Sequence, residues 1–346
     1  MKTLRILTGS YDETHGIWDL RLNMENKSII ACTAAANTRR NSYLAVQGKY
    51  CFAVSETPMA EGSVGQLHSF QITDAGLNHI STLSGLPCLL PHLCVNQSGT
   101  VLYTISYGTG EILAVSVGSD GKLDKVISDT QNTGSSIHPK RQTCAHPHSV
   151  WLAPDATKLY VCDLGTDEVL SWPLTQTGEI CVSKKTRLSV PAGYGPRHMV
   201  FSPDGKWGYV LCEMHYHVLV LKCNNSELEL VNDISLEKNI PNEECGGGAI
   251  RISQDGKLLF CSNRGSKNSR IDILSLNNPT EPCWENSLTE CNWPRDFCVT
   301  KDDQYLICAN QTENTLSIFN RQPGKMKFTL CGKVSSIPTP VCLLPV

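Results

Sequence analysis

The segment Pro196–Glu213 reads PRHMVFSPDGKWGYVLCE and decides the fold of this chain. A short apolar run lies on each side of the polar turn Ser202-Pro203-Asp204-Gly205. Two such runs joined by a turn of this composition predict a β-hairpin. Arg197 stands at the start of the hairpin and Glu213 at its end, so charged side chains flank the two predicted strands.

The same unit recurs along the chain about every 50 residues. The further copies read SYLAVQGKYCFAVSE from Ser42, PHLCVNQSGTVLYTIS from Pro91, PHSVWLAPDATKLYVCD from Pro147, GGAIRISQDGKLLFCSN from Gly247 and PRDFCVTKDDQYLICAN from Pro294. A repeat of this length, built from short strands, is typical of a four-stranded propeller blade. No segment shows a sustained helical period, so we predict an all-β fold.

The two ends of the chain supply strands that belong to no complete unit. Pro340–Leu344 resembles the first strand of a further repeat, while Leu4–Thr8 and Gly16–Asn23 have no unit start of their own. We therefore predict a seven-bladed β-propeller whose last blade is closed by strands from both termini, which leaves no open sheet edge. No linker rich in Pro, Gly or Ser divides the chain, so residues 1–346 are expected to form a single propeller domain.

Composition excludes several classes of partner. The net charge is -3 with no long basic run, so we expect no nucleic-acid partner. No apolar stretch approaches the ~18 residues of a membrane span, and Met1–Gly9 lacks the apolar run of a signal peptide. The 17 cysteines include no Cys-x-x-Cys pair, and many lie at strand-core positions. We therefore expect a cytoplasmic protein with free thiols and no membrane partner.

Equivalent positions of the repeats carry polar residues. The residue after each unit start is His92, His148, Arg197, Gly248 or Arg295, with Tyr43 and Val341 in the weaker copies. The second strands end in Glu56, Tyr107, Asp163, Glu213, Asn263-Arg264 and Asn310. Because the first strand of each blade lines a propeller's channel, these residues predict a polar pocket at one mouth, suited to an anionic ligand and acid–base chemistry. The alternative is that they pair with one another as structural ion pairs.

The chain resembles the seven-bladed lactonase family that includes bacterial 6-phosphogluconolactonase and fungal carboxy-cis,cis-muconate cyclase. The segments that carry this resemblance are His138-Pro139-Lys140-Arg141-Gln142, His146-Pro147-His148, Asp163-Leu164-Gly165-Thr166-Asp167, Gly195-Pro196-Arg197-His198, Glu213, Ser262-Asn263-Arg264-Gly265 and Ala309-Asn310-Gln311. The resemblance implies a site without metal or cofactor that combines one His, two Arg and one Glu. The matching catalytic residues are His148, Arg197, Glu213 and Arg264, with Arg270 and Arg295 as competitors for the second Arg. Substrate-binding candidates are His92, His146, Arg141, His198 and Arg295.

The implied function is the hydrolysis of a sugar lactone, 6-phosphogluconolactone to 6-phosphogluconate in the pentose phosphate pathway. The site must activate water, stabilise the oxyanion and orient the ring. A carboxylate near two Arg is expected to have a lowered pKa, which favours His148 as the base and Glu213 as its orienting partner, although Glu213 could itself be the base. Arg197 and Arg264 would bind the substrate's anionic group or the oxyanion. We expect a small anionic lactone as partner, and a monomer or weak homo-oligomer.

Other functions remain open on the sequence. A muconate-type lactone cycloisomerase would use the same residues, and a propeller that only binds proteins would need none of them. The pairs His146-x-His148 and His215-x-His217 could chelate a metal, but no third ligand stands out. Gly246-Gly247-Gly248 precedes a strand rather than a helix, so we interpret it as a tight turn and not as a phosphate loop.

Overall fold

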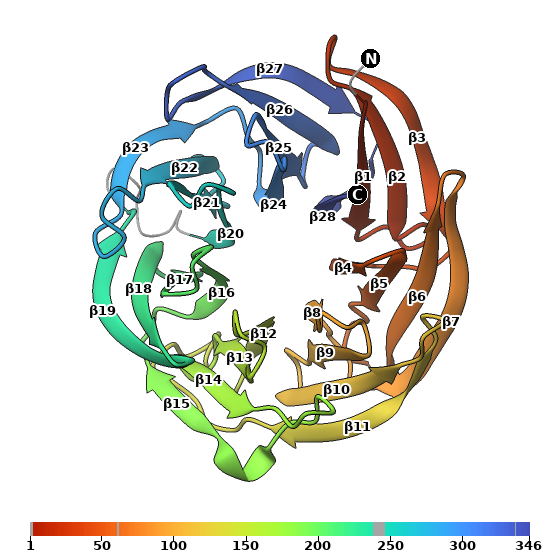
Figure 1. Ribbon diagram of the computed structural model, residues 1–346, viewed down its shortest axis with the longest axis vertical. Helices are drawn as coiled ribbons and strands as arrows, with labels where there is room; N and C mark the ends of the chain where they lie inside the picture. The colour runs from red at the N-terminus through yellow and green to blue at the C-terminus, as the bar shows by residue number, and fades with distance from the viewer. Residues whose placement is uncertain (1–2, 61, 238–245, 336) are drawn as a thin grey trace. The chain divides into compact units, whose positions relative to one another are not determined.

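Seven four-stranded β-sheets form the computed structural model, which describes residues 3–60, 62–237, 246–335 and 337–346. The fold is the predicted seven-bladed β-propeller, with each sheet as one blade (Figure 1). Within the described residues the only helical element is one short 3-10 turn, η1 (Val182–Lys184). No helix in that part of the chain is long and apolar enough to cross a membrane.

Contacts divide the chain into two compact units, which are described one at a time. The first, called the terminal unit, comprises Met1–Tyr11, Trp18–Ala34 and Arg197–Val346. The second, called the three-blade unit, comprises Asp12–Ile17 and Ala35–Pro196. Each unit draws on chain segments that are distant in sequence. That the whole chain is a single domain stays a prediction.

The terminal unit holds four blades, and one of them joins the two ends of the chain. Its sheet order is β28-β1-β2-β3, and β1 pairs antiparallel with β28, with Leu7 opposite Leu344. Figure 1 shows these two strands side by side. The predicted closure by both termini is confirmed. The strands that lie wholly or mainly in this unit are β1 (Thr3–Ser10), β2 (Ile17–Asn23), β3 (Ser28–Ala36), β16 (Pro196–Phe201), β17 (Trp207–Cys212), β18 (His217–Asn224), β19 (Glu227–Ser235), β20 (Gly247–Ile252), β21 (Leu258–Asn263), β22 (Arg270–Ser275), β23 (Cys283–Leu288), β24 (Pro294–Val299), β25 (Tyr305–Asn310), β26 (Thr315–Arg321), β27 (Phe328–Ser335) and β28 (Pro340–Pro345).

The three-blade unit has the same architecture, with its first, second and third repeats as separate sheets. Strand β4 packs against β8, and β8 against β12, so the first strands of neighbouring blades contact each other. The strands of this unit are β4 (Leu44–Gln47), β5 (Tyr50–Ser55), β6 (Gly65–Thr73), β7 (Gly76–Leu86), β8 (His92–Val95), β9 (Val101–Ile105), β10 (Glu111–Val117), β11 (Leu123–Gln131), β12 (Pro147–Leu152), β13 (Lys158–Asp163), β14 (Glu168–Pro173) and β15 (Thr186–Ser189).

Burial follows the position of each strand in its blade. The second strand β17, WGYVLC, is buried at every position beyond its first residue. The outer strand β19, ELELVNDIS, alternates between exposed and half-buried residues. Each apolar core lies between two neighbouring blades; one such core combines Tyr209 and Val218 with Ile250 and Leu259. Inner strands therefore read as continuous apolar runs and outer strands as alternating ones.

The cysteines behave as the sequence predicts. The sixteen cysteines of the described residues are all free, and only Cys144, Cys283 and Cys331 among them are exposed. Cys245 lies outside the described residues. Burial raises the pKa of Cys51 to about 12, which keeps that thiol protonated and chemically inert.

Candidate active site

The hairpin formed by residues 196–213 positions the first ion pair of the candidate site. Arg197 is the second residue of β16, and Glu213 directly follows β17. Nε of Arg197 donates to Oε2 of Glu213 at 2.9 Å, and the Arg197 side chain is only 2% exposed. A further nitrogen, Nη1, donates to the carbonyl of Gly248 and to Nε2 of His198, the latter at 3.1 Å. The guanidinium is therefore held rigidly by three acceptors.

Arg264 approaches the same carboxylate from the next blade. It follows β21, and its Nη2 lies 2.9 Å from Oε2 of Glu213. The same nitrogen donates to the carbonyl of Gly247 at 2.8 Å, and Nε donates to Gly246 at 3.3 Å. Two guanidinium groups thus converge on one carboxylate oxygen.

The three consecutive glycines explain how the strands come this close. A Cβ on Gly247 would lie 2.1 Å from the carbonyl oxygen of Cys212, so only glycine allows β20 to pass the end of β17 at this point. Gly247 and Gly248 begin strand β20, so the prediction of a tight turn is wrong for these two. The backbone is extended here because Gly247 pairs with Asn263 of β21, and the carbonyls of Gly247 and Gly248 accept hydrogen bonds from the two arginines.

A third cation completes the cluster in the terminal unit. Arg295 is the second residue of β24, and its guanidinium stacks over the ring of Tyr11 at 5.0 Å. Burial, followed by the charge of Arg264, lowers the pKa of Arg197 to about 9, which leaves that group charged at neutral pH. Burial also lowers the pKa of Arg264, and Arg295 adds to the effect. Two cations therefore contact the Glu213 carboxylate and a third lies near enough to affect both, and the excess of positive charge favours an anionic ligand.

Two further candidates of the terminal unit, His198 and Arg270, have partners other than Glu213. His198 is buried and accepts from Arg197, so it orients that guanidinium. Arg270 donates to Oδ2 of Asp272 at 2.9 Å and to the carbonyl of Leu236, rather than to Glu213. Arg264 and Arg295 are accordingly the cations that accompany Arg197.

In the three-blade unit, three predicted residues gather around Tyr107. The ring of His146 stacks on the ring of Tyr107 with centroids 4.4 Å apart, and the His148 ring meets it edge-on at 5.8 Å. Nη2 of Arg141 donates to the Tyr107 hydroxyl at 3.4 Å. Tyr107 belongs to the predicted set of strand-end residues, yet it was not assigned a site role, because a tyrosine there carries no motif.

Hydrogen bonds fix the orientation of His146. Its Nδ1 lies 2.7 Å from the carbonyl oxygen of Tyr107, so Nδ1 carries the proton and Nε2 presents a lone pair. The thiol of Cys144 lies 3.5 Å from that Nε2. The backbone N–H of His146 donates to Oδ1 of the buried Asp163 at 2.8 Å, which anchors the start of this segment.

His92 and His148 are both buried, but their surroundings differ. The centroid of the His92 ring lies 3.9 Å from that of Tyr43 and 4.8 Å from that of Trp151. His92 on β8 therefore packs between side chains of the two neighbouring blades. His148 lies on β12 beside Tyr107. Because His148 belongs to the three-blade unit and Arg197 to the terminal unit, their convergence on one ligand stays a prediction.

The paired histidines have other partners. Nδ1 of His215 lies 3.0 Å from Glu237, and Nδ1 of His217 lies 2.6 Å from Asp233. In the parts of the chain that the structure describes, no group of three or more His, Cys, Asp or Glu side chains is arranged to hold a metal ion.

Tyr11 is the site residue that the sequence analysis missed. It follows β1, and its backbone N–H donates to the carbonyl of Thr339, next to β28. Its place beside Arg295 therefore depends on the closure of the last blade. No repeat includes Tyr11, so only the predicted pairing of the two termini could have indicated it.

The fold and the buried carboxylate between two arginines place this chain among β-propellers with a charged cluster at the inner strands. The chain matches the family described as "Lactonase, 7-bladed beta-propeller" over residues 5–345, and it belongs to that family of lactonases. The predicted family and the predicted enzyme class are both confirmed.

Individual relatives agree with this assignment. The chain is 28% identical over 345 residues to a 6-phosphogluconolactonase of Bacillus subtilis, which covers 97% of this chain and 96% of the relative. It is 29% identical over 293 residues to a 6-phosphogluconolactonase of Formosa agariphila, with 82% of each covered. A solved structure, the periplasmic gluconolactonase of Pseudomonas aeruginosa, has a TM-score of 0.89 at 25% identity and covers 100% of this chain and 99% of that one.

Proposed function

We propose that this lactonase hydrolyses an anionic sugar lactone, 6-phosphogluconolactone, to 6-phosphogluconate in the cytoplasm. The observation that carries the proposal is the convergence of Arg197 and Arg264 on one oxygen of Glu213, with Arg295 as a third cation. This cluster has the charge needed for a phosphorylated substrate. The names of the Bacillus and Formosa relatives support the same substrate, and the free cysteines support a reducing compartment.

The reaction requires few protein groups. The oxygen of a water molecule forms a bond to the lactone carbonyl carbon, and the carbonyl electron pair moves onto oxygen. The base takes one proton of this water, the carbonyl re-forms as the ring C–O bond breaks, and the leaving alkoxide takes that proton from the base. The new carboxylic acid releases the second proton of the water, so the products are a carboxylate, a hydroxyl group and one free proton. Fixed guanidinium donors stabilise the negative charge that develops on the carbonyl oxygen. A second guanidinium can bind the phosphate through two parallel hydrogen bonds.

Glu213 and His148 are the two candidate bases. Oε2 of Glu213 accepts from Arg197 and Arg264, each at 2.9 Å. Two cations this close stabilise the charged carboxylate and make it a weaker base, so Glu213 orients the arginines instead. We therefore assign water activation to His148, as the sequence analysis favours, and orientation of the arginines to Glu213. The variant His148→Asn should lose the low-pH limb of the pH–rate profile, whereas Glu213→Gln should lower the rate at every pH.

A lactone panel with a pH-indicator readout tests the substrate. After subtraction of spontaneous hydrolysis, we expect turnover of 6-phosphogluconolactone to exceed that of unphosphorylated gluconolactone and of a muconate-type lactone. The variant Arg295→Ala should raise KM for the phosphorylated substrate, whereas Arg187→Ala should behave as wild type. Arg187 is the matched control because it lies 50% exposed and pairs with Glu168. Equal turnover of phosphorylated and unphosphorylated lactones would contradict the proposed substrate.

A further inference from the structure

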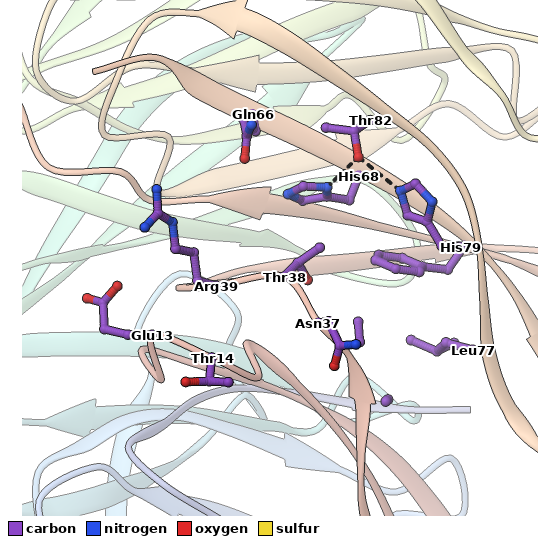
Figure 2. A pocket seen from close by; sticks show the side chains of 13 residues that line it. Glu13, Thr14, Asn37, Thr38, Arg39, Gln66, His68, Leu77, His79 and Thr82 are labelled. Atoms are coloured by element: carbon purple, nitrogen blue, oxygen red, sulfur yellow. Dashed lines mark hydrogen bonds between the residues drawn. The ribbon is translucent and has the colours of Figure 1, made fainter. Parts of the chain in front are cut away.

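A cavity lies in the three-blade unit, lined in part by strands β6 and β7. We call it the β6–β7 pocket and define it by Asn37, Arg39, Gln66, His68, His79 and Thr82 (Figure 2). Its volume is about 610 Å³, within the usual range for sites that hold a small molecule. None of the predicted catalytic or substrate-binding residues lines it.

The register of the sheet brings the two imidazoles together. His68 on β6 lies opposite Thr82 on β7, and Phe70 lies opposite His79, with a bulge between Ser69 and Phe70. The bulge lets His79 and His68 reach the same hydroxyl. Figure 2 shows Thr82 bridging the two rings. Its Oγ1 lies 2.9 Å from Nδ1 of His68 and 2.9 Å from Nε2 of His79.

The direction of each hydrogen bond in this chain can be assigned. The Ser55 hydroxyl donates its only proton to the carbonyl of Arg39 at 2.8 Å, so Ser55 must accept from Nε2 of His68 at 3.1 Å. Burial, with a contribution from His79, lowers the pKa of His68 to about 4, so this ring is neutral at pH 7. Its Nδ1 then accepts the proton of Thr82.

That assignment decides what the pocket presents to a ligand. Because the Thr82 hydroxyl donates its hydrogen bond to His68, its oxygen accepts from Nε2–H of His79. When Nε2 carries the ring proton of His79, Nδ1 holds a lone pair that can accept a hydrogen bond from a ligand hydroxyl. Gln66 donates from Nε2 to Ser84 at 3.1 Å, which leaves its amide oxygen as a second acceptor.

One cation completes the lining. The guanidinium of Arg39 makes no hydrogen bond or ion pair with any residue that the structure describes. The nearby Glu13 pairs with Arg40 instead, at 2.9 Å. Arg39 is the only lysine or arginine among the described lining residues. A planar fork of this kind can bind one carboxylate in bidentate fashion, and its single positive charge matches the single negative charge of a carboxylate.

We infer that the β6–β7 pocket is a second binding site, specific for a small polyhydroxylated carboxylate of the sugar-acid class. Arg39 binds the carboxylate, and His79 and Gln66 accept from the ligand's hydroxyl groups. The inference depends only on this pocket and not on the proposed lactone substrate.

Titration calorimetry with gluconate tests this inference, with sorbitol and acetate as probes that lack the charge and the hydroxyl groups, respectively. We expect gluconate to bind, and sorbitol and acetate to bind at least tenfold more weakly. The variant Arg39→Gln should lose at least tenfold in affinity for gluconate, while the exposed control Arg187→Gln should match wild type.

Gluconate could also bind near Arg295, so the same titration is run on Arg295→Ala. Binding that persists in Arg295→Ala and is lost in Arg39→Gln supports the β6–β7 pocket. Unchanged affinity in Arg39→Gln, loss of all binding in Arg295→Ala, or no gluconate binding to the wild type would each overturn it. Lactonase turnover is not the readout, so failure here leaves the proposed lactone hydrolysis untouched.

Discussion

Removal of the Arg197 side chain is the sharpest perturbation of the candidate active site. The change Arg197→Ala deletes a group that is 2% exposed and donates to Glu213, Gly248 and His198. Loss of one partner of a buried ion pair typically costs about 3–5 kcal/mol of stability. Because Arg264 still neutralises Glu213, we expect the free energy of unfolding to fall by about 3 kcal/mol, at the lower end of that range. The protein should stay folded but melt several degrees lower.

The effect on activity should be larger than the effect on stability. Removal of one fixed donor to a developing oxyanion typically lowers kcat by about 10²–10³-fold. We expect a loss of this size for 6-phosphogluconolactone in the pH-indicator assay, measured well below the melting temperature of the variant. Arg197→Lys should recover little, because a point charge cannot make the bonds to Glu213, Gly248 and His198 that the planar fork makes together.

Circular dichroism and thermal melting separate the two effects. Arg187→Ala again supplies the control, since it removes an exposed arginine from an ion pair of the three-blade unit. If a folded Arg197→Ala protein turned over the lactone at the wild-type rate, the assignment of this cluster to catalysis would be refuted. The ion pairs would then be structural, which is the alternative that the sequence left open.

Three further predictions concern closure, pH and thiols. Deletion of residues 340–346 removes β28 and exposes an edge of β1, so the melting temperature should fall; an unchanged value would count against closure. His68 takes up a proton only near pH 4 when folded but near pH 6.5 when unfolded, so stability falls as the pH drops between these values, by about 2 kcal/mol from pH 7 to pH 5. In His68→Gln that part of the pH dependence of melting should vanish, and an identical slope would disprove the assignment. Titration of the unfolded, unreduced protein should find nearly all 17 thiols, and several bonded pairs would contradict a reducing compartment.

The blades could be predicted from the sequence because their inner strands repeat a local pattern. An apolar run, a turn such as Ser202–Gly205 and a second apolar run lie within about twenty residues, so each hairpin is specified by its own segment. The outer strands carry a weaker signal. Strand β19 is exposed at every second residue, and its polar positions resemble those of a loop.

The sequence predicted which residues belong to the candidate site, but not the contacts that these residues make with one another. Arg197, Glu213 and Arg264 stand directly at strand boundaries, so the repeat itself marks them. Their shared carboxylate oxygen depends on how blades pack, and the glycine at 247 that permits this approach was interpreted as part of a turn. The strand pattern of one hairpin does not predict which residues of neighbouring blades contact each other.

The β6–β7 pocket lay beyond the reach of sequence reasoning for a similar reason. Arg39 precedes β4, while His68 and His79 come from two strands of the first complete blade. No motif joins these three residues. Their meeting depends on the bulge at Ser69 and Phe70, which shifts the pairing of β6 with β7 by one residue and could not be inferred from composition.

The pairing of β1 with β28 also sets the order of events during synthesis. Strand β1 is made more than 300 residues before its partner β28. At ~5–20 residues per second, the free edge of β1 waits for tens of seconds. Blades of the three-blade unit, whose strands are consecutive in sequence, can form during that interval. A nascent chain stalled before Pro340 should therefore hold folded hairpins and a strand β1 whose β28-facing edge is unpaired, an exposed edge of the kind that invites aggregation and chaperone binding.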